Sequence, residues 1–160
     1  RLLGYENRDV ADVDFRNDAV DAGEVGAGHE VTALFEVKLS YRTKGRDLAT
    51  VRIRYENPET GKVTEEARTL RLRDVRRSFQ DPEPSFRLDA AAAQFAEILR
   101  HSYWAKDAEL GEVFTLASEA ASDLGRPDDA MEMVELISRA SRLWPDDADP
   151  QWRYEEPRER

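Results

Sequence analysis

Apolar and polar residues alternate along residues 31–39, which predicts a β-strand. Every second position there is apolar, so one face of an extended chain would be buried and the other solvated. Residues 2–6 are typical of a short strand as well, with no partner visible upstream. Because a strand needs a neighbour for its N–H and C=O groups, we expect chain outside this sequence to supply one. The connection between the two strands, residues 9–29, is long, acidic and rich in glycine.

A β-hairpin is predicted next. The residues predicted to face inward on its first strand are Ala49, Val51, Ile53 and Tyr55. Residues 57–61, Asn-Pro-Glu-Thr-Gly, form a turn, since proline sets φ at its second position and glycine accepts the left-handed conformation. The return strand begins at Lys62, and its apolar set changes phase between Val63 and Leu70, which predicts a bulge near residues 65–68.

The period becomes helical after residue 84 and predicts three helices. Ser85 can cap the first and Asp107 the second, while Gly125 ends the second. Pro127 opens the third, which ends near Trp144. The periodicity predicts an inward face on each helix. Its positions are Leu88, Ala91, Ala92, Phe95, Ile98 and Leu99 on the first helix, Leu110, Val113, Phe114, Ala117, Ala121 and Leu124 on the second, and Ala130, Met133, Val134, Ile137 and Ala140 on the third.

These elements predict an α+β chain with an N-terminal antiparallel β-sandwich-like half followed by a three-helix bundle. We expect the β-rich half at residues 1–80, the bundle at 81–145 and a polar tail at 146–160. Four consecutive alanines at 90–93 would let a neighbouring segment approach the first helix closely. Because the sequence opens with Arg-Leu-Leu-Gly, we expect it to be a piece of something longer.

Charge is distributed unevenly along the 160 residues, whose formal net charge is −10. Residues 1–30 carry 3 basic and 8 acidic groups, residues 31–80 carry 12 and 7, and residues 81–160 carry 9 and 19. A basic middle between acidic flanks argues against a nucleic-acid partner and favours attraction between segments or to an oppositely charged neighbour. The sequence has no cysteine and no apolar run of the ~20 residues that a membrane-spanning helix needs.

Six carboxylates are concentrated between residues 9 and 24: Asp9, Asp12, Asp14, Asp18, Asp21 and Glu24. Such a density could hold calcium, but the EF-hand spacing fails, because Arg16 stands where an oxygen ligand belongs. A solvated acidic loop is therefore the favoured interpretation.

No set of residues has the spacing of a catalytic site. His29 and His101 are far apart in the sequence, and neither belongs to a metal-binding motif. Helical serines without a nucleophile elbow are interpreted as packing or polar-face residues: Ser118, Ser122, Ser138 and Ser141. We therefore expect a chain that is not an enzyme and that holds no cofactor or metal of its own.

A basic stripe follows the hairpin and is the candidate docking surface for an acidic protein partner. An exposed aromatic anchor is predicted in the tail. The stripe and the anchor together comprise Arg52, Arg54, Arg71, Arg73, Arg76 and Trp152. A solvated sheet face is the alternative interpretation. Trp104 and Trp144, near helix ends, are predicted to be lids on the helical core.

Three blocks of this sequence resemble one domain family. They are LLGYENR at 2–8, DAGEVGAGHEVTALFEV at 21–37 and FRLDAAAAQF at 86–95. They are similar to the C-terminal domain of unknown function in bacterial von Willebrand factor type A proteins of the YfbK type.

The resemblance implies where this region lies within a longer multidomain protein, but it does not imply a chemical reaction. In that family an A domain, with its Asp-x-Ser-x-Ser motif for a divalent cation, precedes this region, and the motif is absent from these residues. The resemblance thus implies a periplasmic or cell-surface accessory module that supports the upstream A domain and an unknown protein ligand. The alternative is a cation- or glycan-binding module that uses the acidic 9–24 loop or the β face.

Overall fold

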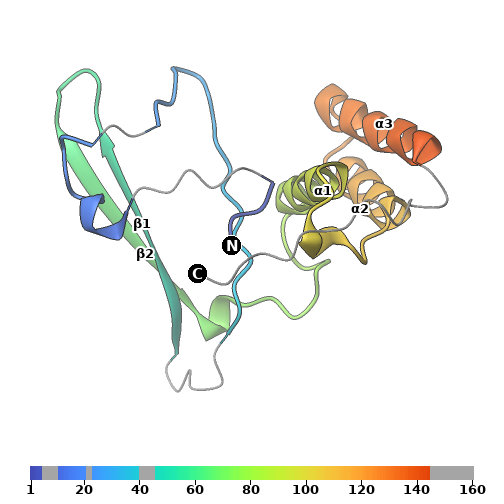
Figure 1. The fold of residues 1–160 in the computed structure, drawn as a ribbon, viewed down its shortest axis with the longest axis horizontal. Coiled ribbons are helices and arrows are strands. Elements are labelled where there is room, and N and C mark those ends of the chain that lie inside the picture. Colours follow the sequence, from blue (N-terminus) through green and yellow to red (C-terminus); the bar gives the residue numbers. More distant parts are fainter. Residues whose placement is uncertain (5–10, 21–22, 40–45, 145–160) are drawn as a thin grey trace. The chain divides into compact units, whose positions relative to one another are not determined.

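The computed structural model describes residues 1–4, 11–20, 23–39 and 46–144 (Figure 1). Its strands and helices, in chain order, are β1 (Asp47–Glu56), β2 (Val63–Arg71), α1 (Pro84–Leu99), α2 (Leu110–Asp123) and α3 (Asp128–Leu143). Single 3-10 turns lie at Asp12–Asp14, Leu72–Asp74 and Tyr103–Ala105. The α+β class with a helical C-terminal part is confirmed. None of the helices described is long and apolar enough to cross a membrane.

The described residues divide into two compact units. The helical unit contains residues 1–4, 32–36 and 78–144, and the hairpin unit contains most of the remainder up to residue 77. The predicted boundary at residue 80 differs from this division, because two N-terminal segments belong with the helices. The predicted polar tail at 146–160 lies outside the described residues.

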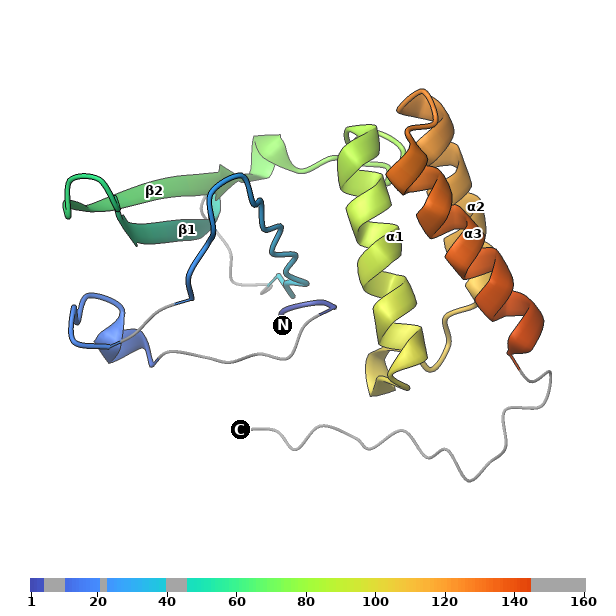
Figure 2. The same ribbon diagram turned by 90° about the horizontal axis from the view of Figure 1, so that it is seen from above.

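The core of the helical unit is built mainly from small side chains. In this unit α2 packs against both α1 and α3, and the three helices lie alongside one another (Figure 2). The buried cluster includes Ala91, Ile98, Leu110, Val113, Ala117, Ala121, Ala130, Val134 and Ile137, all of them predicted to face inward. Leu99, Phe114 and Leu124 were also predicted to face inward, but they are exposed, because the apolar stripe of a helix is wider than the surface that its neighbours cover. Alanines at these positions let the helix axes approach closely, and the larger Val134 and Ile137 fill the remaining space.

The strand predicted at residues 2–6 has a partner within this chain, which corrects the expectation of an external one. Leu2 pairs with Phe35 in an antiparallel bridge. The Leu3 amide donates to the Leu34 carbonyl at 2.8 Å, and the Glu36 amide donates to the Arg1 carbonyl at 2.9 Å. The bridge satisfies backbone groups that the sequence alone left unassigned.

The alanine run does admit a close neighbour, and that neighbour is Gly4. A β-carbon added to Gly4 would lie 3.4 Å from the Ala93 Cα and 3.5 Å from its Cβ. Gly4 also has a φ of +77°, a conformation that side chains disfavour. The positive φ of Gly4, rather than a lack of space beside Ala93, is therefore what disfavours a side chain at this position.

The hairpin forms around the predicted turn. The Asn57 side-chain oxygen accepts hydrogen bonds from the amides of Glu59 and Thr60, each at 3.0 Å, and Gly61 has a φ of +63°. The register is regular from Glu56 opposite Val63 to Ala49 opposite Leu70, and the irregularity lies between Asp47 and Ala49.

The predicted bulge at residues 65–68 is therefore wrong. Val63 lies opposite Glu56, and Leu70 lies opposite Ala49. These two pairs lie on different faces of the hairpin, because side chains alternate along a strand. The change of phase in the sequence reflects two faces of one regular strand.

The predicted strand at residues 31–39 is also corrected, because only the bridge at Phe35 forms there. Its apolar residues Val31, Val37 and Leu39 are all more than half exposed. Alternation predicts that an extended segment has an apolar face, but it does not provide a neighbouring strand. Within the described ranges the only sheet has two strands, so the second layer of a sandwich is not seen there.

Two predicted helix caps are wrong by two residues. Glu83, not Ser85, occupies the N-cap of α1, with Pro84 as the first helical residue. Glu109, not Asp107, occupies the N-cap of α2, because the preceding turn at Tyr103–Ala105 delays the helix. The predicted ends are confirmed: Gly125 follows α2 with a φ of +81°, and α3 ends before Trp144.

Candidate functional site

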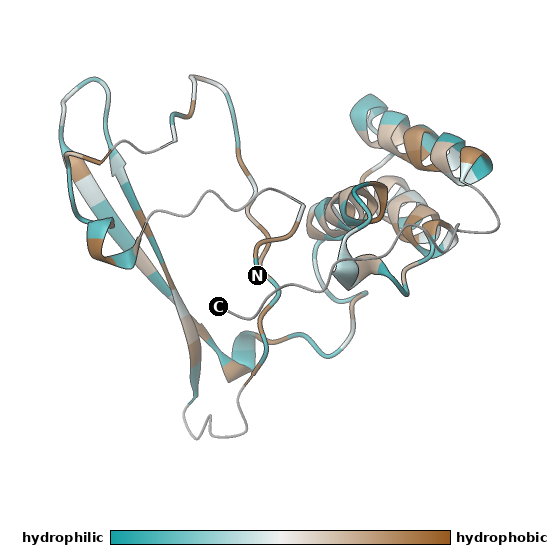
Figure 3. Ribbon diagram, in the orientation of Figure 1, coloured by the Kyte–Doolittle hydropathy of each residue, from teal (hydrophilic) through white to brown (hydrophobic). Residues whose placement is uncertain are grey.

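One face of the hairpin carries an exposed row of apolar side chains. Alternation places Ala49, Val51, Ile53 and Tyr55 of β1 on this face, with Leu70 of β2 opposite Ala49. Val51 is 57% exposed, Ile53 60% and Tyr55 46%. Figure 3 shows hydrophobic positions in both strands. We call these five residues the apolar hairpin face. Residues predicted to be inward thus share one face, but the described chain leaves them in solvent.

The remaining positions of β2 on this face are polar. Arg68 lies opposite Val51, Glu66 opposite Ile53 and Thr64 opposite Tyr55. The Tyr55 hydroxyl lies 3.2 Å from a Glu66 carboxylate oxygen, and this hydrogen bond raises the pKa of the Tyr55 phenol. The apolar row along β1 is therefore bordered by a polar row along β2.

The opposite face of the hairpin is basic, and it is engaged by the acidic N-terminal segment. Arg16 donates two hydrogen bonds to Glu65, each at 2.8 Å, and this pairing lowers the pKa of the Glu65 carboxyl. Arg52 lies 3.9 Å from the same carboxylate, and Arg54 pairs with Asp18. Attraction between the acidic and basic segments, one of the two interpretations of the charge pattern, is thus present in the hairpin unit.

The rest of the predicted docking stripe follows the same pattern of local pairing. Arg71 lies 3.3 Å from Asp47, and Arg73 lies 3.7 Å from Asp74. Arg76 is exposed in the segment after β2, and Trp152 lies outside the described residues. Exposed pairs of this kind contribute little to stability, so they can exchange for other partners. Docking of an acidic protein on these arginines stays a prediction.

The acidic segment does not gather a cation site in the part of the chain that the structure describes. There, no group of three or more His, Asp or Glu side chains is placed to hold a metal. Asp14 accepts a hydrogen bond from Asn17 at 3.2 Å, and Asp18 is paired with Arg54. The other members of the segment are Asp12 and Glu24, which are exposed, and Asp9 and Asp21, which lie outside the described residues.

The two histidines do not lie together, and the two tryptophans near helix ends differ in how far they are buried. His29 lies beside Gly26, whereas the His101 ring lies 5.4 Å from the Trp144 ring. Trp144 packs against the helical core, as predicted for a lid. Trp104 is instead about half exposed, with the Arg1 guanidinium 4.9 Å above its ring. Arg1 covers this tryptophan through a cation–π contact.

The predicted serine positions are likewise dispersed over α2 and α3. The Ser118 hydroxyl is buried without a hydrogen-bond partner among the described residues, and the Ser138 hydroxyl accepts from Arg142 at 2.9 Å. Neither serine has a histidine among its hydrogen-bond partners there.

Glu97 is the most deeply buried charged side chain among the described residues, with 1% of its surface exposed. Arg1 donates to one of its carboxylate oxygens at 2.9 Å. The Gly4 amide donates to the other oxygen at 3.2 Å, and the Arg100 guanidinium lies 2.7 Å from it. We call Glu97, Arg1, Gly4, Arg100 and Ser102 the Glu97 clamp. It joins α1 to the N-terminal segment within the helical unit.

The ionisation of Glu97 is set by two opposing effects. Burial disfavours the charged carboxylate, but hydrogen bonds from Ser102, the Gly4 amide and Arg1, together with the charge of Arg100, outweigh it and lower the pKa of Glu97. The carboxylate is therefore ionised at neutral pH. Each of its oxygens accepts from a donor, so its role is to hold the segment rather than to exchange protons.

Sequence reasoning missed the Glu97 clamp. Glu97 was not among the predicted inward positions of α1, and 96 positions separate it from Arg1. An acidic group is rarely buried unless it is paired, so its burial follows from partners that the local pattern does not show.

Comparison with known proteins places the chain in a family. The model described as "Uncharacterized protein YfbK, C-terminal" matches residues 1–44 and 38–143, so the chain belongs to this family. It is similar to the "Uncharacterized protein YfbK" of Escherichia coli (strain K12), with 28% identity over 141 residues. That match covers 77% of this chain and 24% of the relative, so the chain spans about a quarter of the length of the curated relative it matches. No solved structure matches the chain.

Proposed function

We propose that the chain is a non-enzymatic accessory module, C-terminal to a von Willebrand factor type A domain in a bacterial envelope protein. In this proposal the apolar hairpin face docks onto the remainder of the longer protein, and the helical unit supports interaction with a protein ligand. The docking partner would supply the second layer that a β-sandwich requires.

The observation that carries the proposal is the exposure of the apolar hairpin face. An isolated two-stranded hairpin is at best marginally stable in water, and three or more strands, or packing against another element, are needed for independent stability. Val51 and Ile53 each leave more than half of their surface in solvent. Covering them would remove apolar surface from water, at about 25 cal/mol per Å² buried.

The two faces of the hairpin differ, and the difference favours docking through the apolar face. The basic face is occupied by the Arg16–Glu65 and Arg54–Asp18 pairs. The apolar row along β1 has no such occupant among the described residues. A partner that covers this row leaves the ion pairs of the other face intact.

The length comparison is consistent with docking inside a longer protein. About three-quarters of the YfbK relative lies outside the matched region, so a longer family member has ample chain with which to cover the hairpin. The upstream A domain is the part of that chain that the proposal assigns to this role.

Two single substitutions in β1 test the proposal in a longer family protein. Ile53→Lys places a charge on the apolar hairpin face, whereas Thr50→Lys adds the same charge to the opposite face. We expect Ile53→Lys to lower the melting temperature and increase the radius of gyration of the longer protein, and Thr50→Lys to change both much less. Equal effects of the two substitutions would contradict docking through the apolar hairpin face.

A further inference from the structure

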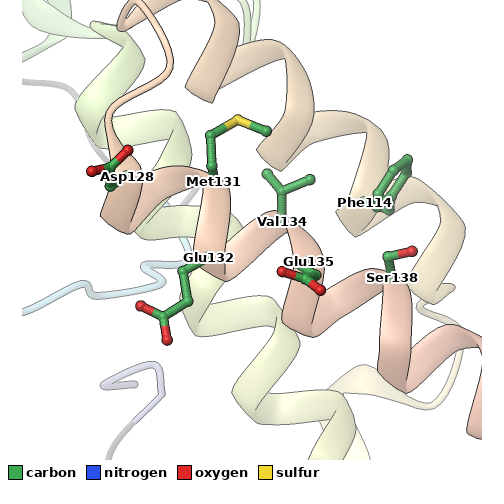
Figure 4. A pocket seen from close by; sticks show the side chains of 7 residues that line it. All are labelled: Phe114, Asp128, Met131, Glu132, Val134, Glu135 and Ser138. Atoms are coloured by element: carbon green, nitrogen blue, oxygen red, sulfur yellow. The ribbon is translucent and has the colours of Figure 1, made fainter.

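A second apolar surface lies between α2 and α3 in the helical unit. The hollow has a volume of about 520 Å³, and its apolar lining consists of Phe114 from α2 with Met131 and Val134 from α3. Phe114 is 37% exposed and Met131 40%, whereas Val134 is almost covered. Figure 4 shows Met131 and Val134 on the same side of α3 as Phe114. We call this surface the α2–α3 groove.

The charged lining of the α2–α3 groove is entirely acidic. Asp128, Glu132 and Glu135 contribute to it, and no lysine or arginine does. Their spacing of four and three residues places the three carboxylates along one stripe of α3. Glu135 is paired with Arg139, whereas Asp128 and Glu132 have no ion-pair partner within the described residues.

The helix dipole accounts for only part of this acidic stripe. Asp128 lies in the first turn of α3, where a negative charge stabilises the helix end. Glu132 and Glu135 lie beyond that turn, and the dipole effect fades within one turn. Two of the three carboxylates are thus placed beside exposed apolar side chains without a stabilising role in the helix end.

We propose that the α2–α3 groove binds a basic amphipathic helix from a protein partner. Apolar side chains of the partner would contact Phe114 and Met131, and its lysines or arginines would lie against Glu132 and Asp128. The 16-residue α3 is about 24 Å long, so a partner helix of three to four turns would match it.

The charge of the surface decides between this occupant and two others. A second copy of the chain carries a net charge of −10 and would bring its own acidic stripe against the first. An anionic membrane surface would be repelled by the same carboxylates. A basic helix is attracted by them, which also accelerates its association. The α2–α3 groove shares no residue with the apolar hairpin face, so the inference does not depend on docking of the hairpin.

A fluorescein-labelled 14-residue peptide of leucine and lysine, with all leucines on one helical face, tests the inference by fluorescence polarisation. We expect the peptide to bind the full 160-residue chain, and we expect its affinity to fall as the salt concentration rises. The double variant Glu132→Lys/Glu135→Lys should weaken binding by at least about fivefold. Met131→Gln, at a partly exposed position, should weaken it while leaving the charge unchanged.

A matched control separates binding in the groove from general attraction to an acidic protein. Glu59→Lys/Glu112→Lys makes the same change in net charge at exposed positions that do not line the groove. We expect this variant to bind the peptide within about twofold of the parent chain. Equal weakening by both double variants, or absence of peptide binding to the parent chain, would overturn the inference. A dimer of the chain that Met131→Gln dissociates would also overturn it, because a second copy would then occupy the groove.

Discussion

The Arg1 guanidinium donates a hydrogen bond of 2.9 Å to the buried carboxylate of Glu97, across 96 positions of sequence. This contact holds the N-terminal segment on α1 and makes the helical unit more than a bundle of consecutive helices. The same guanidinium lies over the Trp104 ring and pairs with Glu36. Arg1 thus links residues from three segments of the helical unit.

Substitution of Glu97 by Gln should destabilise the helical unit. The neutral side chain loses two ion pairs while remaining buried, which we expect to lower the free energy of unfolding by about 1–3 kcal/mol. Glu36→Gln is the matched control. Because Glu36 is exposed, this substitution should lower the free energy of unfolding by less than about 1 kcal/mol. Urea unfolding followed by circular dichroism measures both, and equal losses would contradict a special role of the Glu97 clamp.

The stability contributed by Glu97 should depend on pH in a defined direction. Because its pKa is lower in the folded chain than in the unfolded one, ionised Glu97 stabilises the fold above the unfolded value, about 4.3. This contribution is lost as the pH falls through the folded pKa. Melting temperatures between pH 3 and pH 6 should therefore fall more steeply on acidification in the parent chain than in Glu97→Gln. Parallel curves would contradict the lowered pKa.

Two glycine substitutions should change stability in opposite directions. Gly4→Ala adds a methyl group 3.4 Å from the Ala93 Cα at a residue with a φ of +77°, and should cost about 1–2 kcal/mol. Gly111→Ala adds the same group within α2, where nothing lies within 4 Å, and should stabilise by up to about 1 kcal/mol. Thermal unfolding measures both; stabilisation by Gly4→Ala would contradict the left-handed conformation of Gly4.

Arg87 is a second buried charged residue. Its ion pair with Asp123 can be broken by substituting Asp123 or replaced by an apolar side chain at position 87, and the two losses of stability can be compared. The Arg87 guanidinium lies 2.6 Å from Asp123 and donates to Gln80 at 3.1 Å, while its Nε has no partner within the described chain. Asp123→Asn weakens the pair and should cost about 1–3 kcal/mol. Arg87→Met removes the buried charge and keeps much of the apolar volume, so it should cost less. A larger loss in Arg87→Met, measured by urea unfolding, would be contrary to this account.

Several parts of the fold that depend on local chemistry could be predicted from the sequence. Gly125 after α2 and the turn at residues 57–61 are found as predicted, because each is determined by the φ preference of one residue and by bonds to near neighbours. The inward positions Ala117 and Ile137 follow from helical periodicity in the same way.

The caps at Ser85 and Asp107 and the bulge at residues 65–68 were local errors, but the other wrong predictions concern contacts between residues distant in the sequence. Residues 31–39 alternate as a strand should, yet only Phe35 meets a partner, because alternation does not specify which segment pairs with which. The Glu97 clamp depends on Arg1 and Gly4, and no local pattern places them beside α1. The described residues of the acidic segment are mostly exposed, as predicted for a solvated loop, but the pairing of Asp18 with Arg54 on the hairpin could not be predicted residue by residue.

Cysteine alkylation in a longer family protein tests the docking of the apolar hairpin face most directly. The 160 residues contain no cysteine, so Val51→Cys and Arg52→Cys each introduce a single thiol into this region. The alkylation rate of each thiol is measured on the proteolytic peptide that contains it. The two positions are adjacent, lie on opposite faces of β1, and are each more than half exposed here. We expect the thiol at position 51 to react at least about tenfold more slowly than that at position 52 in the longer protein, and at a similar rate in the 160-residue chain. Similar rates at both positions in the longer protein would contradict the account.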